Sequence, residues 1–539
     1  MGLNNPRLDC HGWAFFMPKE DKHWYQPKGY LHITPRLNRG SDREKITAIV
    51  SDPKLVTRHA FFPLLHKKIA QRRYKVLNED SITGEPVRGH SRVQEDGNIK
   101  LSKKIRPIHY ATHIDSQIYS YYAKEILQPK YEAELAADAD LNRSIIAYRR
   151  IPNENGRGHK GNIHFAKEVF DEIRRRGDCV AMAFDIENFF SSLNHRQLKR
   201  AWAKLLGTKS LPKDHYNLFK SITRFSYIDI DQFRQTNQPG KSVKGFDERK
   251  LAQIRKKGKY AFFESVQELR EAIKAGELRV QKNQFKNRET GKLQGIPQGL
   301  AISALLANVY LLEFDRLIVE RVVKEWGGMY RRYSDDIVII VSPDKKSEVN
   351  SFILKAIEAS KLVISEEKTE ICRFERVSTH ELECYGSIGQ RPERKGMPFC
   401  YLGFEFDGKK VLIKAKNVSK FYRKMKEAVK SKAKQIERVK EKTNDDYPVI
   451  RYRTLSRSYT ERGAKKRMIP VKKTILHYDP ERREYYLDQV SSQRKYWGNS
   501  LGYAKRASEI MDEPSIERQF RNHWKILLKV LKRHGLGKK

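Results

Sequence analysis

The sequence predicts an α+β fold in which helices cover a β-sheet. Two stretches, 179–184 (Cys-Val-Ala-Met-Ala-Phe) and 337–341 (Ile-Val-Ile-Ile-Val), are apolar throughout, as expected for strands buried on both faces. An apolar helix is predicted from about 301 to 326, ending at Gly327-Gly328, and an amphipathic helix around 349–357. These features indicate a sheet with helices packed on its faces.

The N-terminal and middle parts of the chain differ from this core. Residues 1–90 are basic and rich in aromatic residues, which either stack on bases beside phosphate-neutralising cations or form a small packed subdomain. A helix is predicted over Val56–Tyr74, and another begins near Asp115. Residues from about 229 to 290 differ in composition and are interpreted as an insertion with its own small fold, including a helix around Val266–Ile273.

Two arginines lie beyond a predicted strand that begins near residue 143. Arg149 and Arg150 enter a loop rich in Asn, Gly and His. A guanidinium can grip two phosphate oxygens at once, so these arginines suit a triphosphate. An Arg-Arg pair is also common on a solvated surface, and the residues alone leave both interpretations open.

Three aspartates are predicted to lie at strand ends. Asp335 and Asp336 interrupt two short strands and are expected at a hairpin tip, while Asp185 ends the buried strand 179–184. Carboxylates on strand ends are what a two-metal phosphoryl-transfer site requires, because Mg²⁺ prefers oxygen ligands. The alternative is an ordinary polar turn, since spacing in the chain does not by itself bring these aspartates together.

The C-terminal part is predicted to be helical and basic. Its first apolar stripe contains Val418, Phe421, Tyr422, Met425, Ala428 and Val429. A second stripe near the end contains Ile516, Phe520, Trp524, Leu527, Leu528 and Leu531. Lysines on the opposite face of such helices are commonly solvated, but they add to an unusual excess of positive charge over the whole chain.

This charge excess indicates a polyanionic partner. The chain has 108 Lys and Arg against 66 Asp and Glu, a formal net charge of +42. Nucleic acid and an anionic membrane surface are the two candidates. No apolar run approaches the roughly 20 residues of a membrane-spanning helix, so nucleic acid is favoured and no membrane partner is expected.

The cysteines and the N-terminus indicate a reduced, cytoplasmic protein. The chain contains no Cys-x-x-Cys pair, so neither a zinc ribbon nor a disulfide framework is expected. The five cysteines are Cys10, Cys179, Cys372, Cys384 and Cys400. The first 21 residues lack a basic start followed by an apolar block, so no secretory signal is expected.

Three motifs in order resemble those of reverse transcriptases. Ala183–Phe190 (Ala-Phe-Asp-Ile-Glu-Asn-Phe-Phe) resembles their first catalytic motif, and Gly295–Tyr310 resembles their Pro-Gln-Gly motif with its following helix. Tyr333–Asp336 (Tyr-Ser-Asp-Asp) is similar to their Tyr-x-Asp-Asp box. Lys368 and Leu402–Gly403 lie where the later motifs of the family would fall. The joint match is specific, whereas any one motif alone would not be.

The resemblance covers about residues 100–408 and implies a right-hand polymerase. The implied parts are an N-terminal extension (1–90), fingers (91–178), a palm (179–408, with the insertion at about 229–290) and a thumb with a helical C-terminal region (409–539).

The resemblance also implies the metal ligands. Asp185, Asp335 and Asp336 would bind two Mg²⁺ ions, with the backbone carbonyl of Ile186 as a further ligand. Lys368 would act on the departing pyrophosphate.

The nucleotide-binding residues follow from the same motifs. Phe190 matches the aromatic residue that excludes a ribose 2′-hydroxyl and so favours deoxynucleotides. Gln298 would contact the incoming nucleotide and the template, and Arg149 or Arg150 the triphosphate.

Departures from the family pattern narrow the subgroup. No Cys-x-x-Cys pair or His-Asn-His-like segment follows the thumb, unlike many group II intron proteins, and the Asn-Ala-x-x-His and Val-Thr-Gly signatures of retron enzymes are absent. The long extension, insertion and C-terminus resemble the bacterial defence-associated and abortive-infection reverse transcriptases, several of which use a dedicated noncoding RNA. The implied function is RNA-directed DNA synthesis from deoxynucleoside triphosphates on a bound noncoding RNA in antiphage defence, and a homo-oligomer is compatible with the sequence.

Three alternative functions remain compatible with the sequence. A group II intron-like or retron-like reverse transcriptase would have a role outside defence. An RNA polymerase sharing the palm would not need Phe190, and a nonenzymatic RNA-binding scaffold would gain nothing from keeping Asp185, Asp335 and Asp336.

Overall fold

The computed structural model describes most of the chain. It covers residues 24–37, 42–72, 75–79, 86–89, 91–93, 99–101, 103–154, 156, 158–234, 245–378, 381–443, 453–465, 467–479, 484–496 and 498–536. Residues 1–23 of the predicted extension, with Cys10, and residues 235–244 of the predicted insertion lie outside this part.

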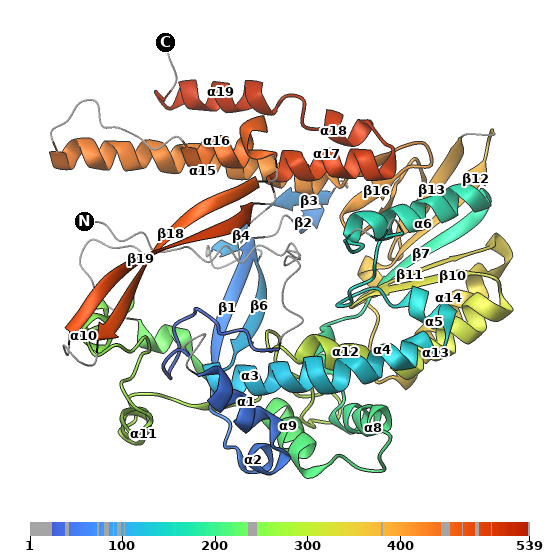
Figure 1. The fold of residues 1–539 in the computed structure, drawn as a ribbon. Helices are drawn as coiled ribbons and strands as arrows, with labels where there is room; N and C mark the ends of the chain where they lie inside the picture. The colour runs from blue at the N-terminus through green and yellow to red at the C-terminus, as the bar shows by residue number, and fades with distance from the viewer. Residues whose placement is uncertain are drawn as a thin grey trace.

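A six-stranded sheet, which we call the palm sheet, lies on the right-hand side of the molecule in Figure 1. Every neighbouring pair in it is antiparallel. In spatial order its strands are β10 (Met329–Tyr333), β11 (Asp336–Val341), β7 (Cys179–Asp185), β12 (Glu370–Arg376), β13 (Leu382–Ile388) and β14 (Arg394–Lys395). The two predicted buried strands, β7 and β11, lie side by side at the centre of this sheet, which confirms the α+β prediction.

Both faces of β7 and β11 are covered, because alternate residues enter two different cores. Val180, Met182 and Phe184 pack in one core with α14 (Lys346–Ala359). Cys179 and Ala181 pack in the other with α6 (Asn162–Arg176). The absence of polar alternation in these strands therefore has a simple cause: neither face meets water.

The helix predicted from 301 to 326 is divided into three pieces. They are α12 (Ser303–Tyr310), α13 (Leu312–Ile318) and a π-helical turn, Val319–Glu325. The chain leaves this helical stretch through Gly327, whose φ of +60° suits glycine, as predicted. The amphipathic helix predicted around 349–357 is confirmed as α14.

A second sheet, the fingers sheet, corrects two predictions. Its strand order is β6 (Lys103–Tyr110), β1 (Leu64–Arg72), β8 (Ser226–Asp229) and β9 (Gln281–Lys282). The helix predicted over Val56–Tyr74 is wrong, since only α2 (Pro53–Arg58) is helical there and β1 follows. Pairing with β6 on one side and β8 on the other overrides the helix propensity of its Lys, Ala and Gln residues.

The predicted insertion is joined to this fingers sheet. β8 ends where the predicted insertion begins and runs parallel to β1, and β9, near the end of the insertion, pairs with β8. Among the described residues its helices are α10 (Glu248–Lys256) and α11 (Val266–Lys274), the second of which was predicted. Leu251 and Leu269 share a small core with Ile33 from the N-terminal segment, so the insertion packs against the rest of the protein.

The described part of the N-terminal extension packs into the protein core. Trp24 and Tyr25 are buried. The Gln117 side chain in α3 (His113–Tyr121) bonds both the amide and the carbonyl of Gln26, at 3.0 and 3.1 Å. Of the two interpretations, packing therefore applies to residues 24–37.

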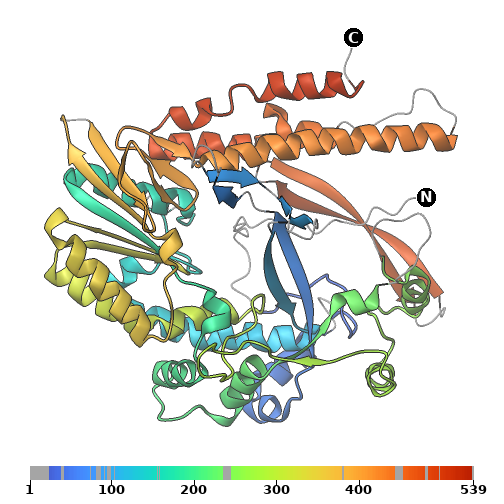
Figure 2. The ribbon, with the colours of Figure 1, turned by 180° about the vertical axis from the view of Figure 1, so that it is seen from behind.

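The C-terminal region combines a small sheet, helices and a long hairpin. The three-stranded sheet contains β15 (Phe399–Tyr401), β16 (Phe404–Phe406) and β17 (Val411–Ile413). The helices are α15 (Ala415–Thr443), α16 (Arg453–Tyr459), α17 (Ser500–Met511), α18 (Ser515–Arg518) and α19 (His523–Arg533). The hairpin β18 (Arg467–Asp479) with β19 (Glu484–Tyr496) was not predicted, and it extends away from these helices (Figures 1 and 2).

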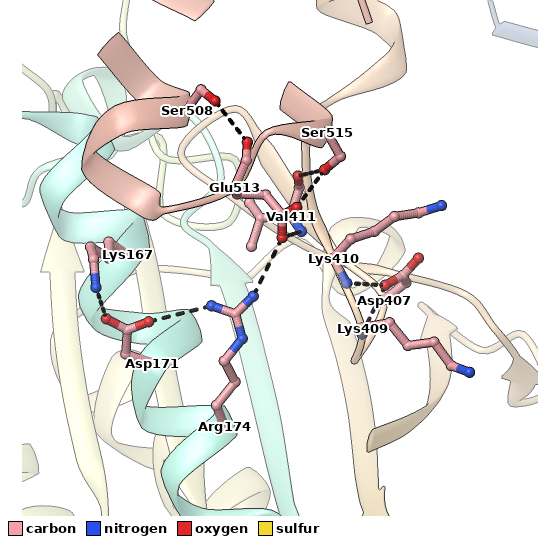
Figure 3. Close-up of polar contacts among 10 residues, drawn as sticks. All are labelled: Lys167, Asp171, Arg174, Asp407, Lys409, Lys410, Val411, Ser508, Glu513 and Ser515. Atoms are coloured by element: carbon pink, nitrogen blue, oxygen red, sulfur yellow. Dashed lines mark hydrogen bonds and ion pairs between the residues drawn. The ribbon is translucent and has the colours of Figure 1, made fainter. Parts of the chain in front are cut away.

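Polar contacts attach the C-terminal helices to the palm (Figure 3). Arg174 in α6 lies 3.7 Å from the Glu513 carboxylate, whose other partners are the Val411 amide and the Ser515 hydroxyl. Asp171 contacts Arg174 and Lys167 on α6. The loop before α18 thus joins α6 to β17.

The remaining elements complete the fold. They are α1 (Arg43–Ser51), β2 (Lys75–Glu79), β3 (Pro86–Gly89), β4 (Ser91–Val93), β5 (Ile99–Leu101), the π-helical turn Tyr122–Leu127, α4 (Gln128–Ala136), α5 (Ala139–Ser144), α7 (Phe189–Ser192), α8 (His195–Leu205) and α9 (Lys213–Thr223), with four 3₁₀ turns at Ile230–Phe233, Pro343–Lys345, Glu366–Lys368 and Glu461–Gly463. Among the described residues, no helix combines the length and apolarity needed to cross a membrane.

Candidate active site

The three predicted aspartates come together where β7 ends and β11 begins in the palm sheet. β10 and β11 form the predicted hairpin, with Tyr333 opposite Asp336. Its two-residue loop is Ser334 and Asp335, so Asp335 lies at the tip, whereas Asp336 is the first residue of β11. Asp336 is also directly opposite Asp185 on β7. The Ile186 amide donates to the Asp335 carbonyl at 3.0 Å, which holds the loop against the end of β7. Sheet register thus joins residues that are far apart in the chain.

Desolvation and mutual repulsion make this cluster unfavourable for negative charge. Desolvation by the surrounding protein, followed by the charges of Asp335 and Asp185, raises the pKa of Asp336 to about 7, although Asp336 is still exposed to solvent. Burial and, to a smaller extent, the Asp185 charge also raise the pKa of Asp335. Such a cluster favours a cation among its oxygens.

The donor set fits a hard divalent cation, since it consists of carboxylate oxygens. Asp185, Asp335 and Asp336 are the residues that could hold it. Within the part of the chain that the structure describes, no group of three His, Cys, Asp or Glu side chains is already arranged to enclose a metal ion. The Asp185 carboxylate instead contacts the Lys368 ammonium.

The Ile186 carbonyl takes no part in the backbone hydrogen bonds that join residues 185–187 to residues 363–365. Ile186 forms an antiparallel bridge with Ile364. The bonds on either side use the Asp185 carbonyl, which accepts from Ser365 at 2.8 Å, and the Glu187 amide, which donates to Val363 at 2.8 Å. This pattern is compatible with the predicted ligand role of that carbonyl.

Lys368 lies close to the aspartates, as its predicted role requires. It is exposed on the 3₁₀ turn Glu366–Lys368, which precedes β12. Because β12 pairs with β7, this turn lies beside the end of β7. The ammonium of Lys368 can therefore neutralise charge that develops next to Asp185.

Phe190 is fixed beside the Pro-Gln-Gly turn. It lies half-buried in α7, directly after the end of β7. Its carbonyl accepts from the Ile296 amide at 2.8 Å, and the Leu193 carbonyl accepts from the Gly295 amide at 2.7 Å. Gly295 has φ of +74°, and a Cβ there would lie 2.5 Å from the Ser191 carbonyl oxygen. Only glycine allows this close approach.

Gln298 connects the same turn to the fingers sheet. Its carbonyl accepts from the His109 amide in β6 at 2.8 Å. Gly299 follows with φ of +118°, and a Cβ there would lie 2.4 Å from the His109 carbonyl oxygen. The turn is therefore held between α7 and β6, with the Gln298 side chain half-buried.

The structure places the two predicted arginines in different surroundings. The Arg149 guanidinium bonds the Glu132 carboxylate at 2.6 and 3.0 Å and the carbonyls of Asn142 and Ile145. Its side chain is only 6% exposed. Arg150 is exposed. The strand predicted from residue 143 is wrong, because α5 continues to Ser144 and its Asp138 cap favours the helix.

Several residues near the site were missed in the sequence. Lys104 on β6 and Lys414 after β17 act electrostatically on Asp335 and Asp336 respectively, in the direction that lowers their pKa values. Tyr148, with φ of +61°, places its hydroxyl 3.0 Å from that of Ser334. Lys104 belongs to a visible basic run, but nothing in that run indicates that it lies across from the palm.

Solved structures with some similarity to this chain include yeast telomerases. The apo telomerase of Candida tropicalis, truncated from its C-terminal domain, has 11% identity and a TM-score of 0.33, with 57% of this chain and 52% of that chain covered. Telomerase of Candida albicans in complex with a TWJ fragment of telomeric RNA has 11% identity and a TM-score of 0.34, with 72% and 56% covered. The chain spans about half the length of these telomerases. No curated protein sequence matches it.

A protein-family comparison identifies the central part of the chain. Residues 243–406 match the family described as "Reverse transcriptase (RNA-dependent DNA polymerase)". The matched range contains Gln298, Asp335, Asp336 and Lys368, whereas Asp185 lies before it. Residues 243–406 therefore match a reverse transcriptase domain, and they lie within an α+β fold.

Proposed function

We propose that this chain is an RNA-directed DNA polymerase that extends a primer with deoxynucleotides. The observation that carries the proposal is the meeting of Asp185, Asp335 and Asp336 at one sheet edge, beside the Pro-Gln-Gly turn of a reverse transcriptase domain. The donor set suits Mg²⁺, and two such ions would activate the primer hydroxyl and stabilise the leaving oxygen. Asp185, Asp335, Asp336 and the Ile186 carbonyl would hold them.

The other site residues have roles that follow from their positions. Lys368, beside Asp185, is suited to the pyrophosphate that leaves when the primer hydroxyl attacks the α-phosphorus. Arg150 is the exposed arginine available to a triphosphate, since Arg149 is bonded within the protein. Gln298 lies within the Pro-Gln-Gly turn and Phe190 lies beside it, where an incoming nucleotide would be read.

The right hand is proposed to divide into fingers (91–178), palm (179–408) and a thumb with the C-terminal region (409–539), with changes. β1 from the predicted extension and β8 from the predicted palm belong to the fingers sheet, and the sheet of β15, β16 and β17 crosses the boundary between palm and thumb. We place the insertion at about 229–290 with the fingers, because β8 and β9 extend the fingers sheet.

A dedicated noncoding RNA is the proposed template, and antiphage defence the proposed setting. The net charge of +42 supports a large polyanionic partner. The long extension, insertion and C-terminal region support the defence subgroup. Sequencing the nucleic acid that copurifies with the protein tests this: one defined small RNA is the expected result, and a random sample of host RNA would contradict it.

Primer extension tests the proposed activity itself. The purified full chain is expected to extend a DNA primer on an RNA template with deoxynucleotides and Mg²⁺, and to stop when the metal is chelated. Extension is measured by gel electrophoresis of a labelled primer. A folded protein that extends none of RNA, DNA or self-primed templates with any divalent metal would contradict the proposal and favour an RNA-binding scaffold.

Replacing Phe190 with alanine should relax the choice of sugar. The ring would no longer exclude a 2′-hydroxyl, so we expect the preference for deoxynucleotides over ribonucleotides to fall by about tenfold or more, about 1.4 kcal/mol of discrimination. The measurement is the ratio of kcat/KM for the two nucleotide types. Phe352→Ala is the matched control, because Phe352 is also a half-buried aromatic residue but packs on Trp326. Unchanged discrimination in Phe190→Ala would remove the steric role.

A further inference from the structure

A fully buried ion pair lies beneath the aspartate hairpin. Arg332 on β10 and Asp315 on α13 are both 0% exposed. Arg332 donates to the two carboxylate oxygens of Asp315 from Nε and Nη2, at 2.7 and 2.6 Å. The Tyr330 hydroxyl donates to the same carboxylate at 2.6 Å. The guanidinium is therefore held in one orientation by a two-point contact.

The remaining nitrogen of this guanidinium reaches the loop itself. Arg332 Nη1 donates to the Asn308 side-chain oxygen at 3.0 Å and to the Ser334 carbonyl at 3.3 Å. Asn308 lies on α12, directly after the Pro-Gln-Gly turn, and its amide donates to the Ala147 carbonyl at 3.0 Å. The Arg332 carbonyl accepts from the Ile146 amide at 3.1 Å. The Arg332 side chain thus joins the helix after the nucleotide-binding turn to the aspartate hairpin, and the Arg332 backbone carbonyl bonds the segment that leads to Arg150.

Ser334 needs this support, because its backbone conformation is unfavourable for serine. Its φ is +63°, and it occupies a loop position of a two-residue hairpin where glycine is usual. It is only 4% exposed. Its carbonyl is bonded by Arg332, and its hydroxyl lies 3.0 Å from that of Tyr148. Asp335 and Asp336 follow directly, so the orientation of Ser334 sets the direction of both carboxylates.

We propose that Arg332, held by Asp315 and Asn308, is a positioning residue that fixes Asp335 and Asp336 for a divalent cation. A buried ion pair contributes little to stability compared with apolar residues of similar volume, so stability alone does not account for it. What the ion pair specifically determines is the backbone conformation of Ser334. The inference rests on the proposed function, because it assigns the cation to that site.

Metal binding in the absence of substrate tests the inference. The double variant Arg332→Met with Asp315→Leu replaces the pair by apolar side chains, and Arg332→Lys keeps the charge but loses the forked contact. We expect Mn²⁺ binding to the full chain, measured by electron paramagnetic resonance, to weaken about tenfold in both variants, as for other residues that orient metal ligands. The melting temperature is measured in parallel and is expected to stay close to that of the wild type.

Control variants separate the loss of ligand positioning from general destabilisation of the fold. Arg316 lies on α13, the helix that carries Asp315, and it pairs with Glu313 and Glu134 at the surface. Arg316→Lys should therefore leave the Mn²⁺ affinity unchanged. Asp335→Asn defines complete loss of the site. If the double variant unfolds, Arg332→Lys provides the test. A folded Arg332→Lys protein with wild-type Mn²⁺ affinity would overturn the inference.

The proposed function can fail independently of this inference. Wild-type Mn²⁺ binding that is lost in Asp335→Asn and weakened in Arg332→Lys supports the positioning role, even if no DNA is made, and the polymerase proposal alone then fails. Mn²⁺ binding that is indifferent to Asp335→Asn overturns the inference, whether or not DNA synthesis is observed.

Discussion

Asp335→Asn is expected to lower RNA-templated DNA synthesis by about a thousandfold, about 4 kcal/mol of lost transition-state stabilisation. The change keeps the shape of the side chain but removes one of the charges that would hold the metal ions. Because partial burial and the Asp185 charge raise the pKa of Asp335, the neutral amide should not destabilise the fold. The rate is measured by single-turnover primer extension, with thermal unfolding recorded for the same samples.

The control for this prediction is Asp344→Asn. Asp344 is exposed on a 3₁₀ turn beyond β11, so the same chemical change there should leave synthesis unaffected. Equal rates for Asp335→Asn and Asp344→Asn would show that Asp335 is not part of the catalytic machinery.

Gly295→Ala should lower activity by about a hundredfold and also lower the melting temperature. A Cβ at Gly295 would lie 2.5 Å from the Ser191 carbonyl oxygen and 2.7 Å from its Cα, so backbone must move. The movement would displace α7 and Phe190 from the Pro-Gln-Gly turn, and misplacement by about 1 Å can cost this much in rate. The readouts are kcat/KM for deoxynucleotides and thermal unfolding.

Gly291 provides a matched comparison a few residues away. Its φ of +65° resembles that of Gly295, but no atom lies within 4 Å of an added Cβ. Gly291→Ala therefore carries only the conformational strain, about 1 kcal/mol, and should keep full activity. If both variants are equally active, the contact with Ser191 does not position the turn.

The sequence predicted the elements whose local pattern matches their environment. β7 and β11 are apolar because both of their faces are buried, and α15 shows the predicted stripe, with Phe421, Met425 and Val429 buried. The strand-end aspartates were visible for a related reason: a carboxylate directly after a buried strand has no structural use within the sheet.

Where long-range pairing competes with local preference, the predictions were wrong. β1 contains good helix formers, yet it pairs with β6 and β8. The segment before Arg149 contains β-branched residues, yet α5 continues to Ser144, and Ile145 forms only an isolated bridge with Arg332. The β18–β19 hairpin was missed although its strands contain aromatic and β-branched residues, because the whole C-terminal region was interpreted as helical.

The sequence by itself determined the fold class, the motifs and the identity of the three aspartates, because each depends on neighbours close in the chain. Only the tertiary structure decided how the three aspartates are arranged. Strand register placed Asp336 opposite Asp185, and desolvation with mutual repulsion shifted its pKa to about 7. The tertiary structure also showed that Arg149 is bonded within the protein and that Arg332 supports Ser334. Register, burial and hydrogen bonding across distant segments have no signature in a local pattern, since they arise only when the sheet has formed.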